Sequence, residues 1–174
     1  MEQTLIIIKP DGVCKRLVGK VLSRFEEASF KIVGLKMLKL TEKIYDEFYS
    51  SHKGKFFYEP YKEFILSAPI ILCVLEGKNV IHRVRKIIGN TDSKKAQIGT
   101  VRNLYGLNDR RNIIHASDSS KTAKFEINYF FTKPEIYSFN NNDWKERKPN
   151  LCKSVVKNDN ENSGTKQRVV VGKI

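Results

Sequence analysis

The sequence has few cysteines, no long apolar segment and a shortage of acidic residues, and each shortage excludes a class of protein. Its three cysteines, Cys14, Cys73 and Cys152, are odd in number and widely separated, so neither a disulfide framework nor a zinc site is indicated. No apolar run approaches the roughly 20 residues of a membrane span. A β-rich run begins almost at Met1, which leaves no room for a cleaved presequence. We therefore expect a cytoplasmic protein without a membrane partner.

The shortage of acidic residues, 19 against 32 Lys and Arg, gives a formal net charge of +13. Such a charge attracts anionic partners, nucleotides and nucleic acid among them. The 174 residues suffice for one well-packed domain, expected over residues 1–146, and an extension. Residues 147–174 are basic and rich in Asn and Lys, so we expect weak structure there, although residues 169–171 have the composition of an edge strand.

Hydrophobic periodicity predicts alternating strands and helices. Apolar runs predict strands at 4–8, 32–40 and 69–75 and a short strand that ends at His115. Amphipathic spacing predicts helices at 18–28, after the N-cap Thr41, around Tyr61, at 80–88, and after an N-cap at Ser117 or Ser119. Residues 90–110 show no periodicity. This order predicts an α/β (α+β) domain of the split βαβ type, with a four-stranded antiparallel sheet and helices on one face.

The run from Arg111 to Asp118 is the best candidate for a functional centre. A strand that passes directly into a helix places the His115 imidazole at a sheet edge, beside unsatisfied N–H groups that suit an anion such as phosphate. The long connection before it carries Thr91 and Arg102, which are side chains that bind phosphate. A lone histidine is more often a structural or surface group, and the residues by themselves leave that alternative open.

Two further cations have similar alternatives. Lys9 ends the first strand, where ligands of α/β sheets usually collect, but a lysine there is often only a solvated strand end. Arg85 lies in the last turn of a predicted helix, where a cation also satisfies the helix dipole.

Two segments, TLIIIKPDGV at 4–13 and RNIIHASDS at 111–119, closely resemble nucleoside diphosphate kinases. The likeness covers roughly residues 3–132 and extends more loosely to Glu146. Landmarks at compatible spacing are Phe48, Tyr49, Phe56, Phe57, Gly77, Arg85, Gly89, Thr91, Gly99, Thr100, Arg102, Glu126 and Ile127. The resemblance implies a ferredoxin-like βαββαβ domain with an active-site loop. It also implies a ping-pong kinase that moves the γ-phosphate of a nucleoside triphosphate onto a histidine, then onto a nucleoside diphosphate, and so maintains nucleoside triphosphate pools.

The resemblance assigns a role to each site residue. His115 matches the nucleophile, and Glu126 and Ser117 match the residues that orient its ring. Tyr49 matches a residue beside the histidine, Phe57 the aromatic that stacks on the base, and Lys9 and Asn112 contacts to the sugar hydroxyl and phosphate. Arg85, Thr91 and Arg102 match groups that stabilise the phosphates. Stacking tolerates every base, so broad acceptance of nucleotides is expected.

The resemblance also implies Mg²⁺, held largely by the nucleotide phosphates and water, with no direct protein ligand and Asp118 at most a partner through water. It implies a homo-oligomer built from dimers. Residues 92–98 lack the prolines of a family loop that contributes to subunit contacts, so hexamer and tetramer stay open. The segment 107–110 departs too, and Asp109 near the base is placed to bias nucleotide preference.

A second function remains open from the sequence. A basic ferredoxin-like module with reduced or no kinase activity would bind nucleotide or nucleic acid through its charge. Most aromatic residues here lie on helical stripes or in core strands, which favours the kinase. Nucleic acid would then be at most a weak partner.

Overall fold

The computed structural model describes residues 1–145. Its strands are β1 (Glu2–Ile8), β2 (Lys31–Leu38), β3 (Ile70–Gly77) and β4 (Ile114–Ala116). Its helices are α1 (Pro10–Cys14), α2 (Val18–Glu27), α3 (Glu42–Phe48), α4 (Tyr58–Leu66), α5 (Val80–Ile88), α6 (Val101–Tyr105) and α7 (Ser120–Phe130). Short 3₁₀ turns occupy Ser50–His52, Ser93–Lys95 and Lys133–Glu135. The predicted strands and longer helices are therefore present, with ends shifted by a few residues.

The four strands form one antiparallel sheet in the order β2-β3-β1-β4. In the central strand β1, Ile7 pairs with Leu72 on one side and with His115 on the other. This register places the middle residue of β4, His115, directly beside the buried half of the central strand β1. The predicted ferredoxin-like architecture is confirmed.

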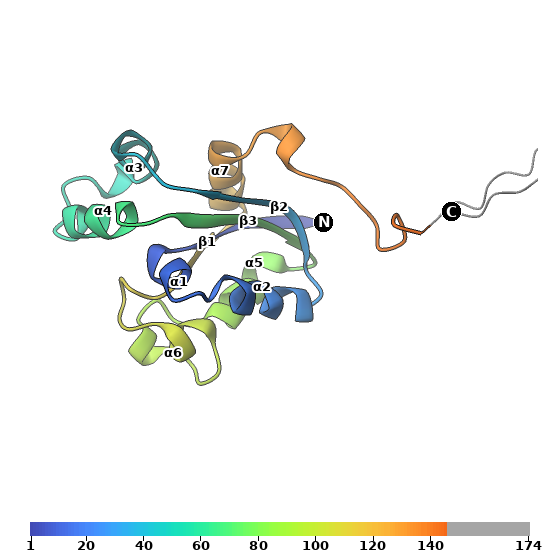
Figure 1. Cartoon of the computed structure of the whole chain (residues 1–174), viewed down its shortest axis with the longest axis horizontal. Coiled ribbons are helices and arrows are strands. Elements are labelled where there is room, and N and C mark those ends of the chain that lie inside the picture. The colour runs from blue at the N-terminus through green and yellow to red at the C-terminus, as the bar shows by residue number, and fades with distance from the viewer. Residues whose placement is uncertain (146–174) are drawn as a thin grey trace, which may run out of the picture. The chain divides into compact units, whose positions relative to one another are not determined.

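Helices cover both faces of the sheet, so the expectation that they pack on one face is wrong. Because side chains alternate along a strand, Ile6 and Ile8 pack with α2 and α5, whereas Leu5 and Ile7 pack with α3, α4 and α7. Figure 1 shows α2 and α5 on one side of the sheet and α3 and α7 on the other. Most positions of the two central strands, β1 and β3, are apolar because helices cover both of their faces.

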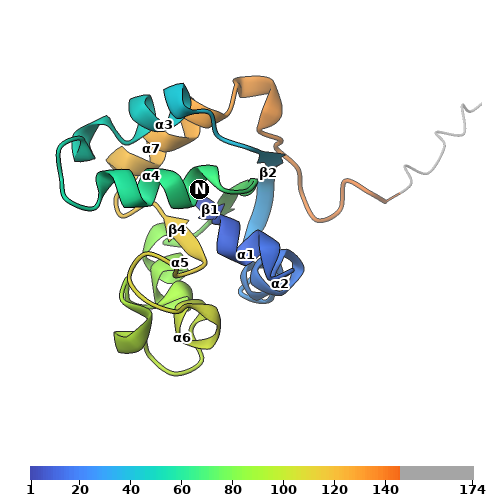
Figure 2. The same ribbon diagram turned by 60° about the vertical axis from the view of Figure 1, so that its left-hand side comes forward.

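The segment from 90 to 110 contains local structure that its sequence pattern does not predict. A 3₁₀ turn at Ser93–Lys95 and the short helix α6 lie within it, and Figure 2 shows this segment in front of α5, next to β4. Arg102 of α6 joins it to the sheet, because its guanidinium donates to the carbonyl oxygens of Gly89 and Ile114 at 2.9 Å each. These anchors hold the segment against the carboxyl end of α5.

The helix that follows β4 is capped by Ser119, which settles the alternative between Ser117 and Ser119. Ser119 Oγ accepts from the Thr122 amide at 3.2 Å, and Thr122 Oγ1 accepts from the Ser119 amide at 3.0 Å. Ser117 does not cap α7; its side chain is buried and donates a hydrogen bond that is described below.

The chain divides into a first compact unit, Met1–Phe139, and a second unit that begins at Asn140. The predicted extension at 147–174, with its edge strand at 169–171, lies outside the described residues. No helix in residues 1–145 combines the length and apolarity needed to cross a membrane.

Candidate active site

One cavity of about 730 Å³ gathers nearly all the predicted site residues. This volume is in the range of small-molecule sites in proteins. The predicted residues that line it are Lys9, Tyr49, Phe57, Arg85, Thr91, Arg102, Asn112, His115, Asp118 and Glu126. They come from the junction of β1 and α1, from β4, α5, α6 and α7, from the α3–α4 insertion and from the loops on either side of β4 and after α5. The tertiary structure thus brings together residues more than a hundred positions apart.

His115 is held by a carboxylate from α7. Its Nε2 lies 3.0 Å and 3.1 Å from the two carboxylate oxygens of Glu126, and Ser117 Oγ donates to Glu126 Oε2 at 2.6 Å. Ser117 is buried and does not line the cavity, so it acts on the ring through Glu126. The His115 side chain is 29% exposed, which leaves the ring accessible to a ligand. Within residues 1–145, Nδ1 has no hydrogen-bond partner.

A strained turn precedes His115. Ile113 has φ of 73°, an unfavourable conformation for a β-branched residue, and the Ile114 amide donates to the Asn112 carbonyl at 2.8 Å across it. Asp11 fixes this turn, because its Oδ2 accepts from the Ile113 amide at 3.1 Å. The Lys9 amide also donates to the Ile113 carbonyl at 2.8 Å. The end of β1 and the start of α1 therefore set the path of the chain that leads to the histidine.

Lys9 and Asn112 form a buried pair on the cavity wall. Lys9 Nζ donates to Asn112 Oδ1 at 2.7 Å and to the Arg110 carbonyl at 3.2 Å. The side-chain amide of Asn112 donates in turn, through Nδ2, to the backbone carbonyls of Thr91 and Asp109, at 2.8 Å each. Burial, and then the charge of Arg102, lower the pKa of Lys9 to about 7. The charges of Asp11 and Asp109 oppose this shift, and an anionic ligand beside the lysine would favour its charged form further.

Two arginines add positive charge to the cavity. Arg85 on α5 is exposed, and Arg102 on α6 is buried. Burial, followed by the charge of Arg85, lowers the pKa of Arg102 to about 10, so the group remains cationic near neutral pH. Arg102 Nε is buried and has no partner among the described residues, so its N–H is available to a ligand.

Aromatic side chains line another part of the cavity. Phe57 is half-buried and Phe56 is 93% exposed, and their rings meet edge to face at 5.5 Å. Tyr49 is buried and meets the Tyr61 ring edge to face at 5.3 Å. Burial raises the pKa of Tyr49 well above its usual value, so this phenol stays neutral. The accessible rings offer flat apolar surfaces to a ligand.

Asp118 is the accessible carboxylate nearest in sequence to the histidine. Its Oδ1 accepts from Thr122 Oγ1 at 2.7 Å, and this hydrogen bond lowers the pKa of Asp118. The carboxylate is therefore ionised near neutral pH. No group of three or more His, Cys, Asp or Glu side chains converges to hold a metal anywhere in residues 1–145.

Some residues that build the site were not identified from the sequence. Asp11 clamps the strained turn, Thr122 orders Asp118, and Tyr61 lies beneath Lys9 with its ring centre 5.2 Å from Nζ. Asp11 belongs to the same short motif as Lys9, and that proximity was the one available signal. The contact between Thr122 and Asp118 spans four residues at the start of α7, whereas the contact between Tyr61 and Lys9 joins distant segments and has no local pattern.

The fold and this cavity together define a ferredoxin-like domain in which cations and aromatic rings line a cavity beside a histidine that is held by a carboxylate. Such a lining suits a ligand that has an anionic group and a flat ring. A family model described as nucleoside diphosphate kinase matches residues 2–136. The chain belongs to the nucleoside diphosphate kinase family.

Individual relatives support this assignment. The nucleoside diphosphate kinase of Pelotomaculum thermopropionicum is 45% identical over 139 residues, which cover 80% of this chain and 93% of that protein. The one from Saccharolobus islandicus is 44% identical over 136 residues, which cover 78% and 99%.

Solved structures of such enzymes have the same fold. The Aquifex aeolicus nucleoside diphosphate kinase superposes with a TM-score of 0.75 at 42% identity, over 78% of this chain and 99% of that one. The Halobacterium salinarum enzyme, solved in complex with CDP, superposes with a TM-score of 0.78 at 35% identity, over 80% and 93%.

Proposed function

We propose that this chain is an active nucleoside diphosphate kinase that works by a ping-pong mechanism through phosphohistidine at His115. The observation that carries the proposal is the triad of His115, Glu126 and Ser117 at a cavity lined by Lys9 and Arg102. No residue assigned by the family resemblance is missing from this arrangement.

The nucleophile is Nδ1 of His115. A carboxylate at 3.0 Å favours the tautomer in which Nε2–H donates to Glu126, so the lone pair is on Nδ1. In the first half-reaction Nδ1 forms a bond to the γ-phosphorus while the bond to the β-γ bridging oxygen breaks, and the diphosphate leaves. Glu126 then stabilises the positive charge that the ring acquires. The second half-reaction reverses these steps with another diphosphate as acceptor.

The cations act on the charge of the phosphates. Arg85, Arg102 and Lys9 bring positive charge to the cavity, and Thr91 adds a hydroxyl donor. Phosphoryl transfer depends mainly on alignment and charge stabilisation, which such groups provide. Phe57 provides the surface on which the base stacks, and Asn112 keeps Lys9 and the loop in place.

The divalent cation is proposed to be Mg²⁺. Asp118 is exposed, ionised and at the cavity, so its carboxylate fits a water-mediated contact to a cation held mainly by phosphate oxygens. Bound there, Mg²⁺ would neutralise charge on the phosphates.

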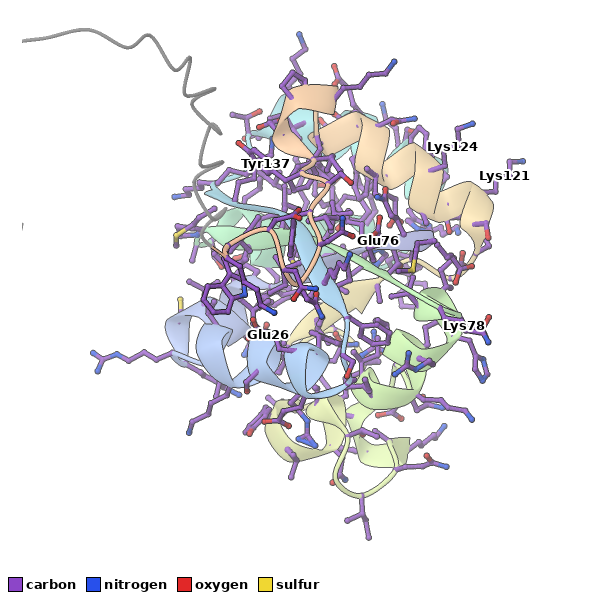
Figure 3. All side chains as sticks on the ribbon, turned by 90° about the vertical axis from the view of Figure 1, so that its right-hand side faces the viewer. Glu26, Glu76, Lys78, Lys121, Lys124 and Tyr137 are labelled. Atoms are coloured by element: carbon purple, nitrogen blue, oxygen red, sulfur yellow. The ribbon has the colours of Figure 1, made fainter. Side chains whose placement is uncertain are left out.

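A nucleic-acid-binding module is the weaker candidate. Figure 3 shows Lys121 and Lys124 on α7 and Lys78 after β3, with the acidic residues Glu76 and Glu26 on the same view of the molecule. Charges of both signs are interspersed there, whereas a backbone-binding surface needs a continuous basic stripe.

The chain is further proposed to form a homo-oligomer built from dimers. Strand β2 is an edge of the sheet, and its Leu35 and Met37 are 53% and 56% exposed. An apolar edge strand is a ready surface for a second copy. Light scattering would give the oligomer's mass, and a monomer at micromolar concentration would refute this proposal. The cytoplasmic location stays a prediction.

The mechanism is tested by labelling the purified full-length protein with γ-labelled ATP and Mg²⁺ and removing the nucleotide. We expect an acid-labile, base-stable label that GDP discharges. His115→Ala should abolish both labelling and turnover while circular dichroism stays native. His82→Ala, which removes an exposed imidazole from α5 outside this cavity, is the matched control and should retain both. Turnover retained in His115→Ala would rule out the mechanism.

A further inference from the structure

One carboxylate in the cavity has no partner. Glu126 accepts from His115 and Ser117, and Asp118 accepts from Thr122. The third, Asp109, is exposed, and within residues 1–145 neither a hydrogen bond nor an ion pair engages its carboxylate. A free acid in a cavity that is otherwise lined by cations needs an explanation, because it opposes the binding of a phosphate.

The backbone on either side of this carboxylate is fixed. The backbone carbonyl of Asp109 accepts from Asn112 Nδ2 at 2.8 Å, and the backbone carbonyl of Arg110 accepts from Lys9 Nζ at 3.2 Å. Both carbonyls are thus used to build the site. The Asp109 and Arg110 side chains line the same cavity as Phe57, without a hydrogen bond to any other described residue.

Electrostatics decides which part of a nucleotide Asp109 can face. Two like charges at 4 Å repel by about 4 kcal/mol at an effective dielectric constant of about 20. The phosphates therefore favour the part of the cavity that contains Arg85, Arg102 and His115. The Asp109 carboxylate therefore faces the neutral part of the nucleotide, where it can accept hydrogen bonds from the N–H groups of the base.

We infer that Asp109 and Arg110 read the edge of the base and make guanine nucleotides the preferred substrates. Guanine presents two adjacent donors, N1–H and the N2 amino group, which one carboxylate can accept together. It also presents the acceptors O6 and N7, which suit a guanidinium. Adenine and cytosine offer a single exocyclic amino group, and uracil only one ring N–H. This inference rests on the proposed function and names its substrate class.

The preference should be moderate. Asp109 is exposed, so water competes for its hydrogen bonds and the gain is that of about one charge-assisted bond, or roughly tenfold in kcat/KM. Stacking on Phe57 does not distinguish bases, so the other nucleotides remain substrates.

The experiment measures kcat/KM for GDP, IDP, ADP and CDP as acceptors from the phosphorylated enzyme. IDP differs from GDP only in lacking the N2 amino group. The native protein should prefer GDP to IDP by about tenfold. Asp109→Asn and Asp109→Ala should bring this ratio close to one, with a larger loss for GDP than for IDP, because IDP offers the carboxylate only N1–H. Asp92→Asn, which makes the same charge change outside the cavity and retains a side chain able to accept from the Lys94 amide, should keep the native ratio.

Equal use of GDP and IDP by the native protein would overturn the inference while leaving the kinase intact. A uniform loss for every acceptor in both Asp109 variants would also overturn it, since it would mean that Asp109 acts only by supporting the charge of Lys9. Absence of transfer to every nucleotide would instead refute the proposed function.

Discussion

Replacing Glu126 by glutamine tests the source of the nucleophile's activation. Glutamine is isosteric, and its carbonyl oxygen can still accept from Nε2–H of His115. The substitution therefore removes the negative charge and preserves one hydrogen bond. Glu126 is 8% exposed, so little solvent screens its charge from the imidazole.

The size of the effect follows from the geometry. Glu126 lies 3.0 Å from Nε2. In the proposed mechanism the ring gains its positive charge as Nδ1 attacks the phosphorus. A hydrogen bond to a charged group contributes about 1.5–3 kcal/mol, against about 1 kcal/mol for a neutral one. Losing the difference, about 2 kcal/mol at most, in the transition state but not in the ground state lowers kcat by up to roughly thirtyfold.

Stopped-flow measurement of phosphoenzyme formation with ATP separates this chemical step from product release. We expect a slower rate constant for phosphorylation and an unchanged dissociation constant for ATP. Glu135→Gln is the matched control: it removes the same charge from a residue paired with Lys36 at 2.7 Å, away from the cavity. A Glu126→Gln rate within twofold of the native rate would refute the role assigned to the carboxylate.

Two further predictions concern the groups around the histidine. Lys9 has a pKa of about 7 in the folded protein and about 10.5 when unfolded, so between these values the unfolded state binds more protons and stability rises with pH. In urea unfolding from pH 7 to 10, the native protein should gain unfolding free energy relative to Lys9→Met, on the order of a few kcal/mol. Its affinity for ATP should fall over the same range as Lys9 loses its charge. Parallel plots of unfolding free energy against pH for the two proteins would contradict this. Asp11→Ala leaves the Ile113 amide without its acceptor, so it should cost about 1–3 kcal/mol of unfolding free energy and lower kcat. Asp11→Asn should recover most of the lost stability and most of the lost kcat. An alanine variant with native stability and kcat would show that the hydrogen bond from Ile113 to Asp11 has no role.

Much of the fold could be predicted from local patterns. The strands and longer helices follow from periodicity, and Thr41 is the N-cap of α3 as its sequence indicates, since its Oγ1 accepts from the Ile44 amide at 3.3 Å. The predicted helices on one face of the sheet were wrong because a strand buried on both sides has no alternation to show where its helices lie.

The site residues were chosen by residue type and family resemblance, and the structure determines what each one contacts. Arg102 is an example. Its residue type indicates a phosphate ligand, yet its two terminal nitrogens donate to backbone carbonyls, and only Nε is left without a partner among the described residues. Its removal should therefore affect folding as well as catalysis.

The sequence by itself determined the family and the order of the elements and singled out His115 as the proposed nucleophile, because these depend on motifs and on contacts between neighbours in the chain. Only the tertiary structure decided that Ser117 supports Glu126, that Asp11 clamps the turn at Ile113, and that Asp109 is left without a partner in the cavity. These relations depend on how β1, β4 and α7 pack together, and the packing of distant segments leaves no periodic signal in the sequence.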